Sequence, residues 1–420
     1  MSKMRDQEAP PGADREIRAL VAGLPRVGEL LAAEHDASRP GHHDTLREIC
    51  QQPKTWRAAG QTADAQLAQV SRLVTESGVR ADPAASVLLT GSGSSHYVGM
   101  CVAPPLQQAW GRYVRAVPCG DLLTQPDAYL PADARCLVVS FGRSGDSPES
   151  GAVVEALHAR DGISQLLITC NRDGGLARRF QGRPRVAVVV LDERTNDRSL
   201  VMTSSLTNMV LTARLIERAL VDGSVRGDTD ELARCAEHII RSHAERLEAV
   251  VRDPVRRVLY LGTGAGYGAA LEAALKMLEM TGGRIETLTE SFLGVRHGPM
   301  AAVDARTLIV CFLSSDPTCR AYEADVVREL NAKGVGARRI LVGAHVDDDL
   351  MRDGDLGVDW GSVGHPADAD ACVLHVLVGQ WLAFWACLRE GMSPDAPSAA
   401  GIITRVVPPF TVHAPAAGAQ

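Results

Sequence analysis

An internal repeat constrains the fold of this chain more than any other feature. The segments VLLTGSGSSHYVG at 87–99 and VLYLGTGAGYGAA at 258–270 share one pattern: a short apolar run, a glycine-rich turn and a helix-like continuation. Such self-similarity indicates duplication of one folding unit. With 420 residues, the chain also exceeds the size at which a single hydrophobic core stops growing. We therefore expect two related domains.

Each half alternates short apolar runs with helix-length segments. This alternation is typical of an α/β domain in which helices flank a parallel sheet. The expected strands are residues 86–90, 136–140, 166–169 and 186–191 in the first half, and 257–261, 307–313 and 339–342 in the second. An apolar helix is expected over 371–388. We predict an N-terminal tail and helical extension (1–74), a first domain (75–227), and a linking helix, second domain and C-terminal tail (228–420).

The N-terminal extension carries helix signals of its own. Amphipathic segments run from Ile17 to Glu34. The segment Thr45–Glu48 has the spacing of a capping box and predicts a helix that begins at this threonine. The preceding His42-His43-Asp44 has no further metal ligands at a suitable spacing, so a solvated turn is favoured over a metal site.

Composition excludes several classes of function. The formal net charge of −7 gives no general electrostatic attraction to nucleic acid or to an anionic membrane, although a local basic pocket is compatible with it. The N-terminus lacks an apolar leader and no uninterrupted apolar run reaches a membrane-spanning length, so we expect a cytoplasmic protein. The ten cysteines form no C-x-x-C pair and are expected to be reduced, mostly buried thiols.

Three turns rich in hydroxyl groups follow expected strands or precede helices. Hydroxyls and backbone N–H groups at helix starts bind anions, and the carboxyl ends of parallel strands meet at one sheet edge. A phosphate is therefore the expected common ligand, although helix capping alone accounts for any single turn. The candidate binding residues are Ser92, Ser94 and Ser95 in the first turn, Arg143, Ser144 and Ser147 in the second, and Thr203 and Ser204 in the third.

The second repeat carries a competing motif. Its turn, Gly264–Ala269, satisfies G-x-G-x-x-A after a strand, and Glu286 follows 22 residues after the first glycine. This spacing is that of a dinucleotide-binding fingerprint, so a nicotinamide enzyme is one alternative. The P-loop motif of nucleoside triphosphate enzymes is absent from the sequence.

The helix after that turn presents Glu272, Lys276 and Glu279 on one face, within about 60° of arc. A surface stripe of ion pairs is the plainer interpretation. However, the stripe begins one turn after the glycine-rich loop and is followed by His297 in a turn-type sequence. A carboxylate, a lysine and a histidine are the groups needed to open a sugar ring and move a proton between adjacent carbons.

Taken together, these motifs resemble one known family. The chain is similar over about residues 46–410 to the double-SIS-domain galactosamine-6-phosphate deaminases/isomerases, also called tagatose-6-phosphate ketose-aldose isomerases. The motifs that carry the resemblance are REICQQPKTW, VLLTGSGSSHYVG, LVVSFGRSGDSPES, LLITCN, RTNDRSLVMTSSLTN, YLGTGAGYGAALEAALKMLEMTGG, SFLGVRHGP and YEADVVREL.

The resemblance implies two tandem SIS domains and roles for individual residues. By similarity to the isomerase half of glucosamine-6-phosphate synthase, Glu279 matches the base that moves a proton between C1 and C2. His297 matches the residue that assists ring opening and that reaches across from a neighbouring subunit, so a homodimer with shared sites is implied. Glu272 and Lys276 would support this helix face, and the hydroxyl-rich turns would hold the sugar phosphate. No metal or cofactor is implied.

Two departures from the synthase shape the expected reaction. The C-terminal segment 399–407 contains no lysine to form an imine with the open-chain sugar. No N-terminal cysteine nucleophile or glutaminase domain is recognised, so we expect deamination or isomerisation rather than ammonia transfer from glutamine. The alternatives are a ketose-aldose isomerase of a non-amino sugar phosphate, and a sugar-phosphate sensor. The absence of a helix-turn-helix or basic segment disfavours a DNA-bound sensor.

Overall fold

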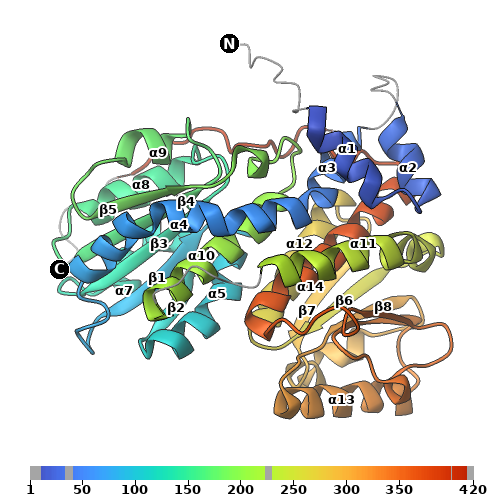
Figure 1. The fold of residues 1–420 in the computed structure, drawn as a ribbon. Coiled ribbons are helices and arrows are strands. Elements are labelled where there is room, and N and C mark those ends of the chain that lie inside the picture. The colour runs from blue at the N-terminus through green and yellow to red at the C-terminus, as the bar shows by residue number, and fades with distance from the viewer. Residues whose placement is uncertain (1–10, 34–40, 223–228, 399, 414–420) are drawn as a thin grey trace.

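The computed structural model describes residues 11–33, 41–222, 229–398 and 400–413. It contains two parallel sheets of five strands each (Figure 1). The first sheet contains β1 (Ser86–Gly91), β2 (Val114–Pro118), β3 (Cys136–Gly142), β4 (Ile163–Thr169) and β5 (Val186–Val190). The second contains β6 (Arg257–Gly262), β7 (Glu286–Ser291), β8 (Thr307–Phe312), β9 (Arg338–Gly343) and β10 (Leu356–Asp359).

The two sheets have the same topology. The first has the order β2-β1-β3-β4-β5, and the second, read from its β7 edge, has the order β7-β6-β8-β9-β10. In both, the second strand along the chain pairs beside the first at an edge, and the later strands follow on the other side. The predicted α/β class and the duplication are therefore confirmed.

Three strands were not predicted from the sequence: β2, β7 and β10. Each lies at an edge of its sheet. Edge strands are less enclosed, and the residues of β7, ETLTES, are only half-buried or exposed. Their sequences therefore lack the continuous apolar run that marks a strand buried on both faces.

One layer of helices lies between the two sheets and shares its core with both. Leu89 of β1 and Tyr260 of β6 point into the same hydrophobic cluster, whereas their neighbours Leu88 and Leu259 point to the outer faces. The helices of the shared layer are α4 (Gln52–Glu76), α5 (Ser94–Trp110), α10 (Ser204–Asp222), α11 (Thr229–Arg252), α12 (Ala265–Met280) and α14 (Asp368–Arg389).

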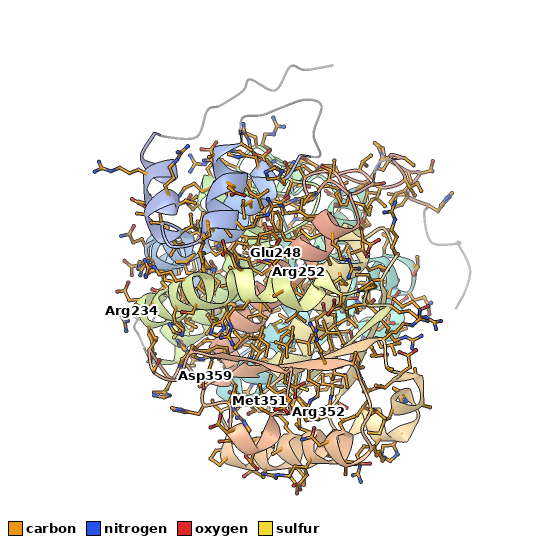
Figure 2. The ribbon with its side chains drawn as sticks, turned by 90° about the vertical axis from the view of Figure 1, so that its right-hand side faces the viewer. Arg234, Glu248, Arg252, Met351, Arg352 and Asp359 are labelled. Carbon is orange, nitrogen blue, oxygen red and sulfur yellow. The ribbon has the colours of Figure 1, made fainter. Side chains whose placement is uncertain are left out.

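Shorter elements cover the outer faces, and α13 lies below the second sheet in Figure 1. Figure 2 shows α11 crossing the side of the molecule, where Arg234, Glu248 and Arg252 mark its course. The outer helices are α6 (Cys119–Thr124), α7 (Pro126–Tyr129), α8 (Pro148–His158), α9 (Gly175–Phe180) and α13 (Pro317–Ala332). The 3₁₀ turns are η1 (Glu193–Thr195), η2 (Gly294–His297), η3 (Pro299–Ala302) and η4 (Asp348–Leu350).

Helix α14 is the most apolar element of the core. Among the described residues it is the one helix long and apolar enough to cross a membrane by length and composition. However, 94% of its most apolar window is buried inside the structure, where it packs against α11 and α12. It is therefore the central core helix, and the helix predicted over 371–388 is confirmed. All ten cysteines are free, and nine are buried, as expected.

The N-terminal extension comprises α1 (Pro11–Leu20), α2 (Pro25–Ala32) and α3 (His43–Cys50). The predicted capping box is wrong, because α3 begins at His43 and the Thr45 hydroxyl donates to Asp395 at 2.7 Å. The predicted boundary at 74 falls inside α4, which packs on β4 and β5 of the first sheet. Glu34 and the predicted boundary at 227 lie outside the described residues. The domain limits stay a prediction.

Candidate active site

The strand order of the first sheet reverses beside β1, which lies between β2 and β3. In open parallel sheets, ligands bind at the carboxyl ends of the strands at such a reversal. The turn after β1 leads into α5 through Gly93, whose φ of 56° lies in the left-handed region that favours glycine. Gly264 repeats this conformation before α12, with the same φ of 56°. The repeats thus share the backbone of the turn, but only the first keeps its serines.

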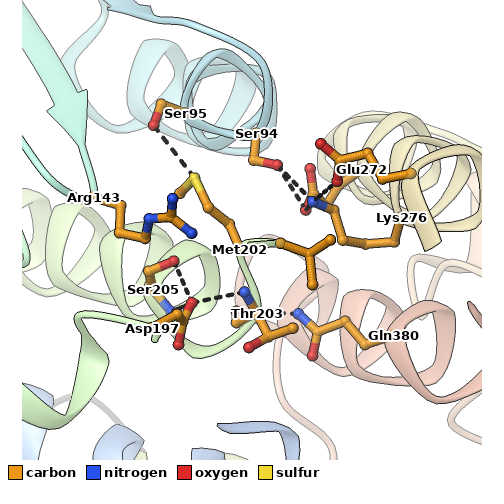
Figure 3. A network of polar contacts seen from close by, with 12 residues as sticks. Ser94, Ser95, Arg143, Asp197, Met202, Thr203, Ser205, Glu272, Lys276 and Gln380 are labelled. Carbon is orange, nitrogen blue, oxygen red and sulfur yellow. Dashed lines mark hydrogen bonds and ion pairs between the residues drawn. The ribbon is translucent and has the colours of Figure 1, made fainter. Parts of the chain in front are cut away.

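Helix α12 of the second half brings the predicted catalytic face to this turn. The Lys276 ammonium donates to the Ser94 hydroxyl at 3.0 Å, and this hydroxyl donates to Glu272 Oε1 at 3.1 Å (Figure 3). The ammonium also lies 3.4 Å from Glu272 Oε1 and contacts the Glu279 carboxylate directly. The two repeats therefore meet in one polar cluster that combines a hydroxyl, an ammonium and two carboxylates.

Burial sets the electrostatics of this cluster. Glu272 is fully buried, and burial raises the pKa of its carboxyl to about 7 against the opposing effect of Lys276. Burial by itself lowers the pKa of Lys276, but the two carboxylates outweigh it and hold the pKa above its ordinary value. Lys276 is thus a buried cation held between carboxylates. The Glu279 side chain keeps 23% of its surface exposed, so it is the carboxylate that solvent and a ligand can reach.

The turn after β3 was expected to bind phosphate. Its Arg143 is buried, and the guanidinium donates to the carbonyls of Leu200 at 2.9 Å and Arg405 at 2.6 Å. Burial, reinforced by the Arg405 charge, lowers its pKa. The Ser144 hydroxyl accepts from Asp146 N at 3.2 Å within the turn, whereas Arg143 ties the turn to other segments of the chain. Ser147, half-buried, precedes α8 and makes no capping hydrogen bond with its side chain.

The turn after β1 places its three serines differently. Ser94 and Ser95 open α5 and are buried, whereas Ser92 is half-buried within the turn. The Ser95 hydroxyl lies 3.9 Å from Met202 Sδ, a weak contact that joins this turn to the third one (Figure 3). Among the described residues, buried polar atoms without a partner include Ser140 Oγ, Glu149 Oε2 and Glu272 Oε2. Such atoms near one sheet edge are expected where a polar ligand completes the bonding.

The third turn is a buried network around Asp197. This carboxylate accepts from Thr203 N at 2.7 Å, from the Ser205 hydroxyl at 2.6 Å and from the Ser204 hydroxyl. The Thr203 hydroxyl donates weakly to Glu48 at 3.4 Å. Thr203 and Ser204 are fully buried, so their hydroxyls already serve carboxylates. The expectation that they bind the phosphate stays a prediction, and in the structure these hydroxyls bond to Glu48 and Asp197.

Among the described residues, His297 makes no hydrogen bond or ion pair with Glu272, Lys276 or Glu279 of the same chain. It ends η2 and is exposed, and no contact between it and Glu279 occurs in the described part of the chain. Gly298, which follows it, has a φ of 129°. Two exposed leucines lie close to these residues in the sequence. Leu293, shortly before His297, is 46% exposed, and Leu278, next to Glu279 in α12, is 44% exposed. One chain therefore brings together Glu272, Lys276 and Glu279 but not the histidine.

The dinucleotide alternative does not fit the structure. Glu286 is the first residue of β7 and pairs in register with Arg257, the first residue of β6. It therefore lies at the amino ends of the strands, whereas the glycine turn follows their carboxyl ends. A ribose-binding carboxylate belongs at the carboxyl edge. Gly268, at an unspecified position of that motif, serves the packing of α12 on α5, because a Cβ there would stand 2.6 Å from Cys101 N. Within the described ranges, no group of three or more His, Cys, Asp or Glu side chains is placed to hold a metal ion.

Sequence reasoning missed the residues that organise the loops. Glu48 accepts from Ser199 N at 3.1 Å, and burial together with the Asp197 charge raises its pKa well above the ordinary value. Arg405 donates to the Asp197 carbonyl at 2.8 Å, so the C-terminal segment is fastened to the same loop. Gln380 of α14 donates to the Thr203 carbonyl at 3.1 Å. Glu48 lies in the motif REIC and Asp197 in the motif RTNDRS. Membership of these two motifs is the sequence feature that could have identified both residues.

Comparison with known proteins gives relatives along nearly the whole chain. A protein of Streptomyces coelicolor, provisionally named D-galactosamine-6-phosphate deaminase AgaS, is 38% identical over 88% of this chain and 95% of its own length. The D-galactosamine-6-phosphate deaminase AgaS of Escherichia coli O157:H7 is 34% identical over the same shares. No family model matches the chain.

Solved structures agree with these relatives. The tagatose-6-phosphate ketose/aldose isomerase of Escherichia coli superposes with a TM-score of 0.77 at 32% identity, covering 84% of this chain and 95% of the other. The C-terminal domain of glucosamine-fructose-6-phosphate aminotransferase from Francisella tularensis has a TM-score of 0.67 at 19% identity, over 84% of this chain and 98% of that one. This second likeness shows the fold alone.

Proposed function

Since the chain belongs to the AgaS family of galactosamine-6-phosphate deaminases and tagatose-6-phosphate ketose/aldose isomerases, we propose that it deaminates an aldohexosamine 6-phosphate. The products are a ketohexose 6-phosphate and ammonia, and galactosamine 6-phosphate is the first candidate substrate. The observation that carries the proposal is the Lys276 ammonium between buried Glu272 and accessible Glu279, beside the Ser94 turn. We place this enzyme in the cytoplasm.

The turns after β1 and β3 hold the phosphate in this proposal. Each turn leads into a helix of more than two turns, α5 after β1 and α8 after β3. The first N–H groups of such a helix have no partner within the helix and can donate to an anion. The Ser147 side chain is not used as a cap, and it is therefore the leading phosphate donor in the second turn. Arg143 acts by fixing that turn, because three of its hydrogen bonds go to backbone carbonyls.

Glu279 moves the proton. After ring opening, its carboxylate takes the C2 proton of the 2-amino aldehyde and returns it to C1, while a proton passes from the amino nitrogen to O1. The C1 carbonyl thereby becomes a hydroxyl, and a 2-imino sugar remains. Water then adds to the C2–N double bond, and ammonia leaves as the C2 carbonyl forms. Lys276 positions the carboxylate that acts first, because its ammonium contacts Glu279 directly.

Ring opening needs a group that delivers a proton to the ring oxygen as the C1–O5 bond breaks. We assign this step to His297 of a second subunit. Within one chain, His297 is exposed and makes no hydrogen bond or ion pair with Glu279 among the described residues. The exposed side chains of Leu278 and Leu293 support an apolar contact between copies near this point. A homodimer with shared sites is thus part of the proposal.

A second candidate is isomerisation of a non-amino sugar phosphate. The solved Escherichia coli relative carries the name of a ketose/aldose isomerase, and the same proton transfer without an amino group interconverts a ketose and an aldose. The two functions share Glu279 and differ only in whether a nitrogen leaves C2.

Ammonia release distinguishes the candidates. Purified protein is incubated in excess EDTA with galactosamine 6-phosphate and, in parallel, with glucosamine 6-phosphate. The proposal expects ammonia from one of them, with galactosamine 6-phosphate preferred. No ammonia from either, together with conversion of tagatose 6-phosphate to an aldose phosphate, would replace the deaminase by the isomerase.

A further inference from the structure

A cavity lies between α1 of the N-terminal extension and the elements on which this helix packs. It has a volume of about 240 Å³ and lies between α1, the junction of α3 with α4, η1 and α11. It shares no residue with the catalytic face of α12. A space of this size holds a small metabolite, somewhat below the usual range for larger ligands.

The walls of the cavity differ in chemistry. One wall is apolar, with Ile17 and Leu20 of α1 and Pro53 of α4. The other walls carry the basic side chains Lys54, Arg57, Arg194 and Arg241 against the two carboxylates Glu16 and Glu237. Lys54 is held by Glu16 and Arg194 by Asp192, each at 2.7 Å, so Arg57 and Arg241 are the lining cations that a ligand can recruit. Guanidinium groups around an apolar wall suit a phosphate group attached to a carbon body.

Two of the arginines share one carboxylate. Arg57 lies 2.7 Å from Glu237, and Arg241 lies 3.8 Å from the other oxygen of the same group. Arg57 also reaches the exposed Asp230 at 3.3 Å. The Arg57 and Arg241 side chains remain 37% and 55% exposed. Exposed pairs of this kind are worth under about 1 kcal/mol, so both guanidiniums can turn to an anion at little cost.

Gln51 joins this cavity to the active-site loops. It lines the cavity, and its amide donates to the Arg194 carbonyl at 2.9 Å and to the Ser204 hydroxyl at 3.1 Å. Ser204 in turn donates to Asp197, the carboxylate that organises the third turn. A ligand that moves Arg194 therefore acts on a chain of hydrogen bonds that ends at the loop beside the catalytic cluster.

We propose that this cavity is a second binding site, which takes a small phosphorylated metabolite with its phosphate on Arg57 and Arg241 and its carbon body against Ile17 and Leu20. Occupancy alters the loop around Asp197 and so changes turnover. This regulatory part rests on the proposed function, whereas binding itself does not.

Titration calorimetry with inorganic phosphate tests the binding. We expect two sites per chain in the wild type and one in Arg57→Gln/Arg241→Gln, with at least about tenfold weaker binding at the altered site. The matched control is Arg234→Gln, an exposed arginine of α11 labelled in Figure 2, which should keep two sites. Equal titrations for the wild type and the double variant would overturn the proposal. One phosphate site in the wild type and none in the double variant would support binding in this cavity. The same result would count against the phosphate site proposed for the enzyme reaction.

Turnover tests the coupling, with glycerol 3-phosphate as the probe. Glycerol 3-phosphate should change the turnover rate of the wild type by several-fold and should have a clearly smaller effect on the turnover rate of the double variant. An equal effect on both would assign the probe to the active site and overturn the regulatory part. If the double variant fails to fold, Arg241→Gln serves alone, because its ion pair with Glu237 is long and exposed. About tenfold weaker phosphate binding is expected, and unchanged binding would contradict the proposal.

Discussion

The Lys276 ammonium contacts Glu279 one turn along α12 while lying 3.4 Å from Glu272 one turn before it. The lysine and Glu272 are almost completely buried, and Glu279 is not. The same helix face therefore has an enclosed carboxylate at one end and an accessible carboxylate at the other.

Removing the ammonium should be costly. In Lys276→Met, Glu272 is left buried without its cation, and breaking a buried pair costs roughly 3–5 kcal/mol of unfolding free energy. Urea unfolding measures this change. The matched control is Lys333→Met, whose surface pair with Glu329 at 2.6 Å should be worth no more than about 1 kcal/mol. Similar losses in both variants would show that burial of Lys276 has no special role.

The pH dependence of stability should reveal Glu272. Its pKa is about 7 in the folded protein, above the ordinary value near 4.5, so the folded state holds this proton more tightly than the unfolded state. Its contribution is therefore fully present below about pH 4.5 and is lost as the pH rises to about 7. The unfolding free energy of the wild type minus that of Glu272→Gln should fall over this window, by on the order of 3 kcal/mol. A difference that is constant between these pH values would contradict the shift.

Close packing of α5 on α12 should depend on one glycine. In Gly268→Ala the new Cβ would stand 2.6 Å from Cys101 N, so the two helices must separate, at a cost of about 1–3 kcal/mol. Turnover should fall as well, because Ser94 and Glu272 meet across these helices. Gly60→Ala in α4 meets nothing within 4 Å and should stabilise by about 0.5–1 kcal/mol. Thermal unfolding of both variants decides the point, and equal melting temperatures would count against it.

The outcome of the sequence predictions follows burial. Strands enclosed on both faces, such as β3 and β4, were recognised by continuous apolar runs, whereas the edge strands β2, β7 and β10 were not. The face of Glu272, Lys276 and Glu279 was found because helical spacing is local. The bonds of Asp197 to Thr203 and Ser204 join side chains six and seven residues apart through an irregular loop, and Thr45 bonds to Asp395 near the other end of the chain. Neither relationship has a periodic signal.

The C-terminal segment should stabilise the third turn. Arg405→Ala removes donors to the Asp197 carbonyl and to Asn196 Oδ1, each at 2.8 Å. Net losses of about 1 kcal/mol per hydrogen bond predict roughly tenfold or faster amide exchange in residues 196–205, measured by mass spectrometry. Arg306→Ala, an exposed arginine in another loop, should leave this exchange unchanged. Equal exchange in both variants would mean that the segment does not support the loop.

If Glu279 moves the proton, Glu279→Gln should lose turnover of galactosamine 6-phosphate without losing the substrate. Acid–base groups of this kind contribute about 10²- to 10⁴-fold, so kcat should fall by that factor. Calorimetry should show that substrate affinity stays within a few-fold, since the phosphate lies on the other turns. A kcat near that of the wild type, with binding intact, would remove Glu279 from this role.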